Sequence, residues 1–157
     1  MAKAYFAAGC FWGIQQRFSR LNGVEKTAVG YMGGITDSPD YKSVCTGKTG
    51  HAEVVEVEYD PKVVDFEGLL SCFFEWHDPT QVNRQGPDIG NQYRTAIFPQ
   101  TDEQWLKARE KINQLSKSGR FGQPIATSIE HADKFWPAED YHQNYFDKRG
   151  LGHFGIG

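Results

Sequence analysis

Short segments with the alternating period of a strand and longer segments with the period of a helix follow one another along this chain. Strands are predicted at residues 3–8, 24–32, 53–59, 93–98 and 125–129. Helices are predicted at residues 11–21, 66–74, 102–118 and 137–146. Because the first two strands are separated by one helix and the middle strands flank long loops, we expect an α+β fold. The expected architecture is a two-layer sandwich, in which helices pack on a mixed sheet. The pattern favours this fold over a doubly wound fold with a parallel sheet.

Residues that cap helices mark several of these boundaries. Asp65 is placed to cap the second helix, and Thr101 with Gln104 has the pattern of a capping box before the third. Gly119 is expected to end the third helix, and Pro137 to begin the last one.

Two long polar segments lie between these elements. Residues 35–50 are rich in Gly, Ser, Thr and Asp, and residues 77–92 form a second loop. Loops longer than ~12–15 residues in a compact domain are usually functional or disordered. We therefore expect both loops to contribute to a functional site.

Length and composition favour a single domain over residues 1–157, with a Gly-rich tail from about residue 147. The chain has 22 aromatic residues against 23 Ile, Leu and Val residues, so some rings are expected to line a site. A net charge of −3 without basic runs excludes nucleic-acid binding through bulk charge and a polybasic membrane anchor. No segment has the ~18 apolar residues of a membrane span, and we expect a cytoplasmic protein.

Three cysteines without a Cys-x-x-Cys pair fit a reducing compartment and argue against a structural zinc site. Cys10, in Gly9-Cys10-Phe11-Trp12-Gly13, stands where a buried strand ends and a helix begins. The N–H groups and dipole of a helix N-terminus lower the pKa of a thiol, so Cys10 is expected to be reactive. The alternative is a small buried residue without chemistry, the commonest role of a free cysteine.

Glu53 is the second candidate because of its phase in the strand 53–59. Side chains alternate between the faces of a strand, and Glu53 is in phase with the apolar Val55 and Val57, while Glu56 and Glu58 share the other face. Burial would raise the pKa of Glu53 and let it hold a proton near neutral pH. The alternative is that Glu53 begins the strand and turns towards water.

The long loops hold the other candidates. Tyr41 and Tyr93 carry phenol groups, which can hold an oxygen atom by hydrogen bonds without a charge. Asp88 in the second loop could orient a neighbouring group. Cys45 lies in the first loop, where its thiol is expected to be accessible, and Cys72 is expected to pack on its helix.

Several separated stretches carry a resemblance to a known family. They are Gly9-Cys10-Phe11-Trp12-Gly13, Gly50-His51-Ala52-Glu53, residues 77–84, Gly90-Asn91-Gln92-Tyr93-Arg94 and Pro137-Ala138-Glu139-Asp140-Tyr141-His142-Gln143. The chain resembles peptide methionine sulfoxide reductase, type A, nearly from end to end. The first stretch is the signature of that family.

The resemblance implies a role for each matching residue. Cys10 matches the nucleophile that attacks the sulfoxide sulfur and is left as a sulfenic acid. Glu53 matches the acid that protonates the sulfoxide oxygen, and Tyr41 and Tyr93 match the phenols that hold this oxygen. Asp88 matches an acidic residue that organises the site.

The resemblance also implies a substrate pocket and a fold. Phe11 and Trp12 match the apolar wall that accepts the methyl group of the substrate. The family reduces the S epimer of methionine sulfoxide, free or in proteins, and so repairs oxidised proteins. It has a split βαβ (ferredoxin-like) core, and no bound metal or organic cofactor is implied.

The chain departs from the family at its C-terminus. Many members carry recycling cysteines there, whereas residues 146–157 contain none. The sulfenic acid must then be reduced by Cys45, by Cys72, or directly by an external thiol such as thioredoxin or glutaredoxin. Of the two internal cysteines, Cys45 is the better candidate because it lies in a flexible loop. Between the internal and external routes, we expect direct reduction by an external thiol.

Two other functions would use the same residues. A cysteine hydrolase or acyltransferase would need a base, and neither His51 nor His142, both expected to be structural, is placed to activate Cys10. The other alternative is a binding module that senses oxidants through Cys10 without turnover.

Overall fold

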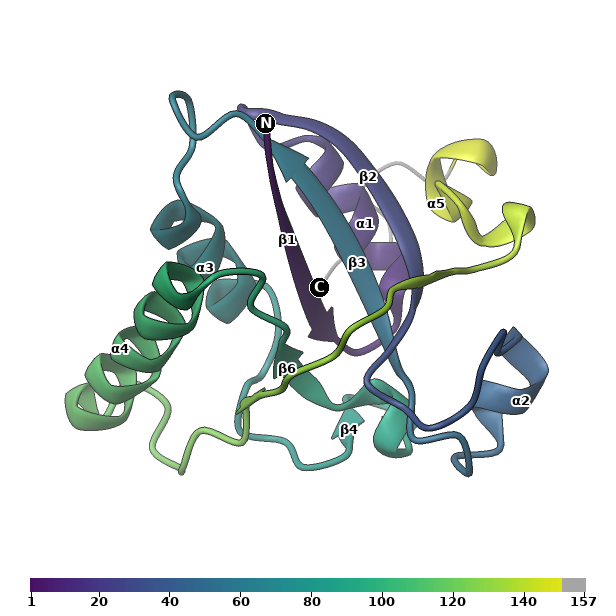
Figure 1. The fold of residues 1–157 in the computed structure, drawn as a ribbon. Helices are drawn as coiled ribbons and strands as arrows, with labels where there is room; N and C mark the ends of the chain where they lie inside the picture. Colours follow the sequence, from purple (N-terminus) through teal and green to yellow (C-terminus); the bar gives the residue numbers. More distant parts are fainter. Residues whose placement is uncertain (151–157) are drawn as a thin grey trace.

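A six-stranded mixed sheet runs through the centre of the computed structural model, which describes residues 1–150 (Figure 1). Its strands, in spatial order, are β7 (Ser128–Ile129), β6 (Thr95–Ile97), β1 (Ala2–Ala8), β3 (Ala52–Tyr59), β2 (Val24–Met32) and β8 (Trp136–Pro137). Within this sheet β6 and β7 run parallel, and the other neighbours run antiparallel. A separate hairpin consists of β4 (Arg84–Gln85) and β5 (Asp88–Ile89).

Two interlocked split βαβ units form the core of the sheet. The strands β1 and β2 are joined by α1 (Phe11–Ser19) and are parallel to each other, with β3 inserted between them. Likewise β3 and β6 are connected through α3 (Phe66–Glu75), with β1 between them. The resulting order β6-β1-β3-β2 is that of a ferredoxin-like fold. The predicted fold class is therefore confirmed.

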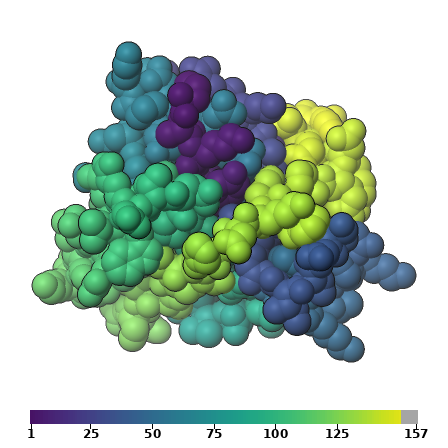
Figure 2. Space-filling view, in the orientation of Figure 1, coloured from purple at the N-terminus to yellow at the C-terminus, as the bar shows by residue number. Residues whose placement is uncertain are grey.

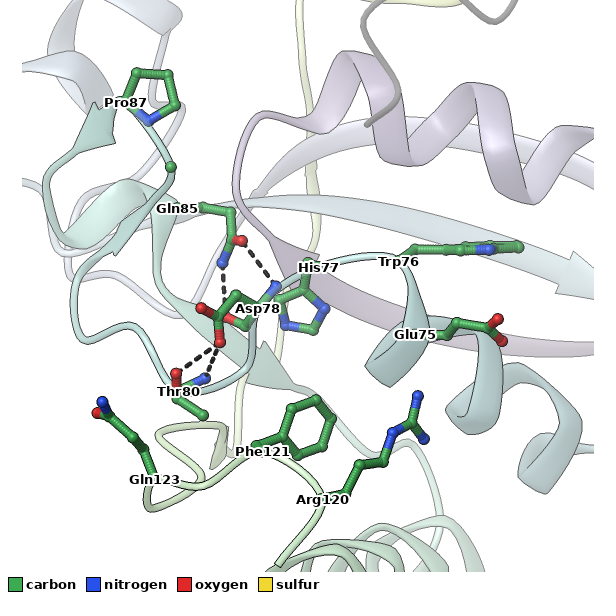
Figure 3. Close-up of a pocket in the computed structure, with 11 residues that line it drawn as sticks. Glu75, Trp76, His77, Asp78, Thr80, Gln85, Pro87, Arg120, Phe121 and Gln123 are labelled. Atoms are coloured by element: carbon green, nitrogen blue, oxygen red, sulfur yellow. Dashed lines mark hydrogen bonds between the residues drawn. The ribbon is translucent and has the colours of Figure 1, made fainter.

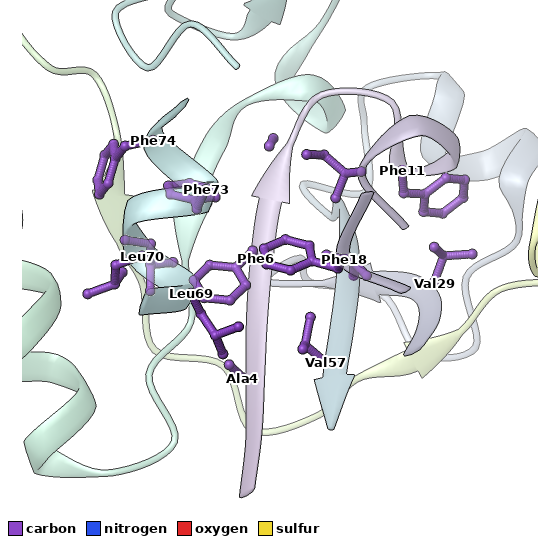
Figure 4. Packing of buried hydrophobic residues seen from close by; sticks show 14 of the residues in the cluster. Ala4, Phe6, Phe11, Phe18, Val29, Val57, Leu69, Leu70, Phe73 and Phe74 are labelled. Atoms are coloured by element: carbon purple, nitrogen blue, oxygen red, sulfur yellow. The ribbon is translucent and has the colours of Figure 1, made fainter. Parts of the chain in front are cut away.

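One face of the sheet is covered by α1 and α3, and α4 (Asp102–Ser118) packs beside α3. Phe6 on β1 is fully buried at the centre of this layer, with Phe18 close to it in Figure 4. The ring of Phe6 stacks on Phe18 at 5.3 Å, on Phe73 at 5.2 Å and on Phe66 at 6.0 Å between centroids. A single β1 side chain thus joins both covering helices.

The opposite face of the sheet is covered by a chain segment and not by helices. There, Tyr5, Val54 and Phe98 form a second apolar cluster against which Ala132 and Phe135 pack. Figures 1 and 2 show the yellow-green segment that carries these two residues crossing in front of the sheet. Alternating strand residues are therefore buried on both faces.

The predicted helix caps are largely confirmed. Asp65 Oδ1 accepts from the Gly68 N–H at 2.8 Å, and Thr101 Oγ1 accepts from the Gln104 N–H at 3.1 Å. Gly119 ends α4 in the left-handed region at φ 68°. The capping box is only half formed, because Gln104 Oε1 accepts from the Gln100 N–H instead.

The prediction of a last helix starting at Pro137 is wrong. Pro137 lies in β8 and pairs with Gly30, and only η2 (Asp140–His142) and α5 (Tyr145–Lys148) are helical in this region. A proline has no N–H to donate. Both the first turn of a helix and an edge strand tolerate this, so the residue type alone does not distinguish them. Tertiary pairing decides between the two, and Ala138 continues it by donating to Val29 O at 2.9 Å.

Both long loops contain short ordered elements that the sequence pattern did not predict. The first contains α2 (Tyr41–Cys45), where Asp40 and Ser43 form a capping box. The second contains the β4–β5 hairpin and η1 (Asn91–Tyr93), so Tyr93 precedes β6 instead of opening it. The predicted strand 125–129 is reduced to β7. Most of the Gly-rich tail, residues 151–157, lies outside the described residues.

Across residues 1–150 no helix combines the length and the apolar character that crossing a membrane requires.

The stacked rings around Phe6 predict a large cost for removing that side chain. We expect Phe6→Ala to lower the free energy of unfolding by about 3–5 kcal/mol, since it leaves a cavity between the sheet and two helices. Urea unfolding followed by circular dichroism measures the change. Val63→Ala, at a site that is 54% exposed, is the control and should cost less than ~1 kcal/mol. A similar, small loss in both variants would contradict the packing.

Candidate active site

Cys10 is the N-cap of α1 and directly follows the end of β1. The turn depends on Gly9, whose φ of 88° is in the left-handed region. A Cβ atom at Gly9 would come within 2.7 Å of Gln85 Cβ on β4, so the β4–β5 hairpin lies against this turn. The strand, the helix and the hairpin together place the Cys10 thiol.

Glu53 is buried, as its phase in the strand predicts, with 2% of its surface exposed. Its Oε1 accepts a hydrogen bond from the Phe11 N–H at 3.1 Å. Burial raises the pKa of Glu53 to about 8, the charge of Asp88 adds to this, and the Phe11 N–H opposes it. The Glu53 carboxyl is therefore largely protonated at neutral pH, next to the residue that follows Cys10.

The expectation that Cys10 has a lowered pKa is wrong, although the helix N-terminus acts in the expected direction. Burial raises the pKa of this thiol to about 12, and the charge of Glu53 acts in the same direction. The N–H groups of Trp12 and Gly13 do lower the pKa, but by less than burial raises it. The folded protein accordingly holds Cys10 as a neutral thiol.

The two candidate phenols lie on separate loop elements that face Glu53. Tyr41 begins α2 and Tyr93 ends η1, and burial together with the charge of Glu53 raises the pKa of both. The two elements are tied together because Asn91 Nδ2 donates to Gly47 O at 3.1 Å. Both phenols therefore keep their protons and can donate hydrogen bonds.

Cys45 joins this group and Cys72 does not lie with it. Burial raises the pKa of the Cys45 thiol, the charge of Glu53 adds to this, and the Tyr41 and Tyr93 phenols oppose it, so Cys45 lies near all three. The residue is exposed, as predicted. Cys72 is half-buried on α3, where it packs against the core as predicted.

Asp88 lies on β5, where its charge raises the pKa of Glu53, Cys10 and Tyr93. It therefore lies near the same group of side chains. The effect of Asp88 on Glu53 favours the protonated carboxyl.

Trp12 is held by residues of the C-terminal segment. Its Nε1–H donates to His142 Nδ1 at 2.9 Å, and its ring stacks on Tyr145 at 3.7 Å and 4°. His142 is fully buried, which agrees with its expected structural role. Phe11 is 1% exposed and packs between Tyr31 and His142, so Trp12 presents more surface than Phe11 does.

The sequence pattern did not predict that His142 and Tyr145 contact Trp12. Their contacts with Trp12 span more than a hundred residues. The available signal was the matching stretch at residues 137–143, which contains His142.

A cavity of about 800 Å³ lies beside the candidate residues and is lined by none of them (Figure 3). It is bounded by the end of α3, the β4–β5 hairpin and the loop after α4, with Trp76, His77 and Phe121 in its wall. Gln85 lines this cavity and also packs against Gly9. Its side chain is fixed by Asp78, whose N–H donates to it and whose carbonyl accepts from it, both at 2.8 Å.

Within residues 1–150, no three or more His, Cys, Asp or Glu side chains are grouped in a way that could hold a metal ion.

Comparison with known proteins gives one consistent family. The sequence profile described as "Peptide methionine sulfoxide reductase" matches residues 2–154. A Methanoculleus marisnigri protein described as "Peptide methionine sulfoxide reductase MsrA" is 55% identical over 152 residues, or 97% of this chain and 93% of that protein.

Two solved structures are similar in fold as well as in sequence. Methionine sulfoxide reductase A of Corynebacterium diphtheriae superposes with a TM-score of 0.90 at 39% identity, covering 98% of this chain and 77% of that one. Mxr1 from Saccharomyces cerevisiae in complex with Trx2 superposes with a TM-score of 0.64 at 26% identity, covering 92% and 84%.

The raised pKa of Glu53 predicts a pH-dependent cost to stability. The unfolded carboxyl loses its proton near its ordinary pKa of 4.5, while the folded one keeps it up to about 8. The unfolded state therefore binds fewer protons between these values, and the wild type loses stability as pH rises through this window. We expect Glu53→Gln to match the wild type at about pH 4 and to be more stable by roughly 5 kcal/mol at about pH 9, since the pKa difference is about 3.5.

Urea unfolding at a series of pH values measures this difference. Glu58→Gln, on the opposite face of β3, is the matched control. A stability difference between Glu53→Gln and the wild type that does not change with pH would contradict the assignment.

Proposed function

The chain belongs to the peptide methionine sulfoxide reductase family, and on this premise we propose that it reduces methionine-S-sulfoxide, free or in proteins, through nucleophilic attack by Cys10. The observation that carries the mechanism is the buried, neutral Glu53 carboxyl, bonded to the first amide of the helix that Cys10 caps. One acid and one nucleophile are thereby held next to each other. The activity repairs oxidised proteins.

The charge state of the site matches the charge state of the substrate. A sulfoxide is neutral, with an oxygen that accepts hydrogen bonds and a small methyl group. Burial keeps Glu53, Tyr41 and Tyr93 protonated, so each can donate a hydrogen bond to that oxygen. We assign the methyl group to the wall formed by Trp12 and Phe11, with Asp88 supporting the protonated state of Glu53.

The chemical step transfers one oxygen atom from the substrate sulfur to Cys10. The Cys10 sulfur attacks the sulfoxide sulfur while Glu53 gives its proton to the oxygen, which makes the substrate sulfur more electrophilic. The thiol proton of Cys10 then replaces the proton on Glu53. The hydroxyl then passes from the substrate sulfur to the Cys10 sulfur: the S–O bond of the substrate and the S–S bond formed in the attack both break, and a Cys10 S–O bond forms. Methionine leaves as a thioether, and Cys10 is left as a sulfenic acid.

Selectivity for one epimer follows from three fixed directions. The oxygen faces the donors, the methyl group faces the Trp12 ring, and Cys10 attacks the sulfur along a third direction. The other epimer exchanges the oxygen with one of the carbon substituents, which places a carbon group against three hydrogen-bond donors. Buried donors without a partner are costly, so only one epimer is reduced, and the resemblance to the family assigns it as the S epimer.

We propose that an external thiol of the thioredoxin class reduces the sulfenic acid. The support is the similarity to yeast Mxr1, which forms a complex with the thioredoxin Trx2. One observation favours a second route, in which Cys45 first forms a disulfide with Cys10, since the Cys45 thiol lies near both phenols.

The three cysteines are free thiols, which suits a reducing compartment. We therefore propose that the protein is located in the cytoplasm.

Substitutions at Glu53 test the role of the neutral acid. Glu53→Gln keeps a hydrogen-bond donor and should retain kcat/KM within about tenfold, whereas Glu53→Ala should lose about a hundredfold. Steady-state assays with methionine-S-sulfoxide and thioredoxin measure both. Equal, severe losses of kcat/KM in the two variants would contradict a role of Glu53 as a hydrogen-bond donor.

A single turnover without added reductant separates the reduction routes. Pre-reduced protein should form methionine from the S epimer only, and intact mass should increase by one oxygen at Cys10. Loss of two hydrogens instead would indicate a disulfide through Cys45 or Cys72, and Cys45→Ser identifies which. Methionine from neither epimer would rule out the proposed function.

A further inference from the structure

Glu139 lies between β8 and η2, and its two carboxylate oxygens have different partners. Oε1 accepts from the Tyr31 O–H at 2.9 Å, and Oε2 accepts from the Tyr41 N–H at 2.9 Å. Tyr31 is fully buried on β2, whereas Tyr41 is half-buried at the start of α2. One side chain thus connects the rigid sheet with the short helix that carries a candidate phenol.

The position of Glu139 is fixed by its own neighbours in the chain. Ala138 donates to Val29 O at 2.9 Å. Gln143 accepts from the Val29 N–H and donates to the Val29 carbonyl, both at 2.9 Å. The segment on either side of Glu139 is therefore anchored to β2 by backbone and side-chain bonds.

The α2 helix needs such an anchor because it spans only the five residues Tyr41–Cys45. A single helical turn is not stable by itself in water, and its first N–H groups have no partner within the helix. The side chain of Asp40 accepts from the Ser43 N–H, which leaves the Tyr41 N–H to Glu139.

We propose that Glu139 is a positioning residue, which holds the Tyr41 amide so that the Tyr41 phenol faces the sulfoxide oxygen. This proposal rests on the proposed function, because Glu139 would affect the reductase reaction only by positioning Tyr41. Burial acts to raise the pKa of Glu139, yet the Tyr41 N–H and the Tyr31 O–H bring it below its usual value. The carboxylate is thus ionised and accepts both bonds.

A double-mutant cycle with Tyr41→Phe tests this role through kcat/KM for methionine-S-sulfoxide. If Glu139 acts through the Tyr41 phenol, Glu139→Ala should lower kcat/KM about tenfold in the wild-type background and less than about twofold in the Tyr41→Phe background. An equal loss in both backgrounds would overturn the proposal, because the effect would not pass through that phenol.

Conservative and matched variants separate positioning from general stability. Glu139→Gln can still accept from the Tyr41 N–H while its NH₂ donates to the Tyr31 oxygen, so it should recover kcat/KM to within about threefold of the wild type. Asp147→Ala removes another carboxylate of the C-terminal segment, one that accepts from Gln16 and Arg20, and should leave kcat/KM unchanged. A loss for Asp147→Ala as large as that for Glu139→Ala would contradict a specific role.

Amide hydrogen exchange of Tyr41, followed by NMR, tests the anchor without any activity. The Tyr41 N–H should exchange at least about tenfold faster in Glu139→Ala than in the wild type, and at nearly the wild-type rate in Glu139→Gln. Unchanged exchange in Glu139→Ala would overturn the proposal. If the wild type forms no methionine, the proposed function fails, and the exchange rates still show whether Glu139 holds α2.

Discussion

The hydrogen bond from the Phe11 amide to Glu53 holds the start of β3 against the start of α1, where Cys10 lies. It can form because β3 lies next to β1 in antiparallel register, which brings the start of β3 beside the end of β1, where α1 begins. The split βαβ connection thereby places a carboxyl and a thiol from strands more than forty residues apart next to each other. Because the acceptor is a buried, largely neutral acid, the contact fixes an acid close to the proposed nucleophile, Cys10, without placing a charge in the core.

The four candidate groups that would contact the sulfoxide are neutral, and this follows from how they are enclosed. Cys10, Glu53 and the two phenols all have pKa values raised mainly by burial, which disfavours each charged form. Two loop elements and a hairpin provide this burial, and each carries one of the candidate side chains. The two loop elements that contribute to this burial therefore also carry the two phenol donors, Tyr41 and Tyr93.

Much of this could be predicted from the sequence, where the signal is local. The family follows from short motifs, the fold class from the order of elements, and the burial of Glu53 from its phase with Val55. The pKa of Cys10 was predicted in the wrong direction, because a helix N-terminus is visible in the sequence and desolvation by distant segments is not. Pro137 was misplaced for a similar reason, since pairing with Gly30 overrides its local preference. The partners of Trp12 and Tyr41 lie about a hundred or more residues away, beyond the reach of any period or spacing.

The C-terminal segment closes both edges of the sheet, with β7 beside β6 and β8 beside β2. The two strands are themselves the sheet edges, and each is only two residues long, which leaves little edge for pairing with other chains. Its two strands pair with β6 and β2, which precede it in the chain, and it carries the residues that hold Trp12 and Tyr41. During synthesis on the ribosome, the sheet core can therefore assemble before the site does. A nascent chain gains the contacts that hold Trp12 and Tyr41 only after residues 136–145 have been made.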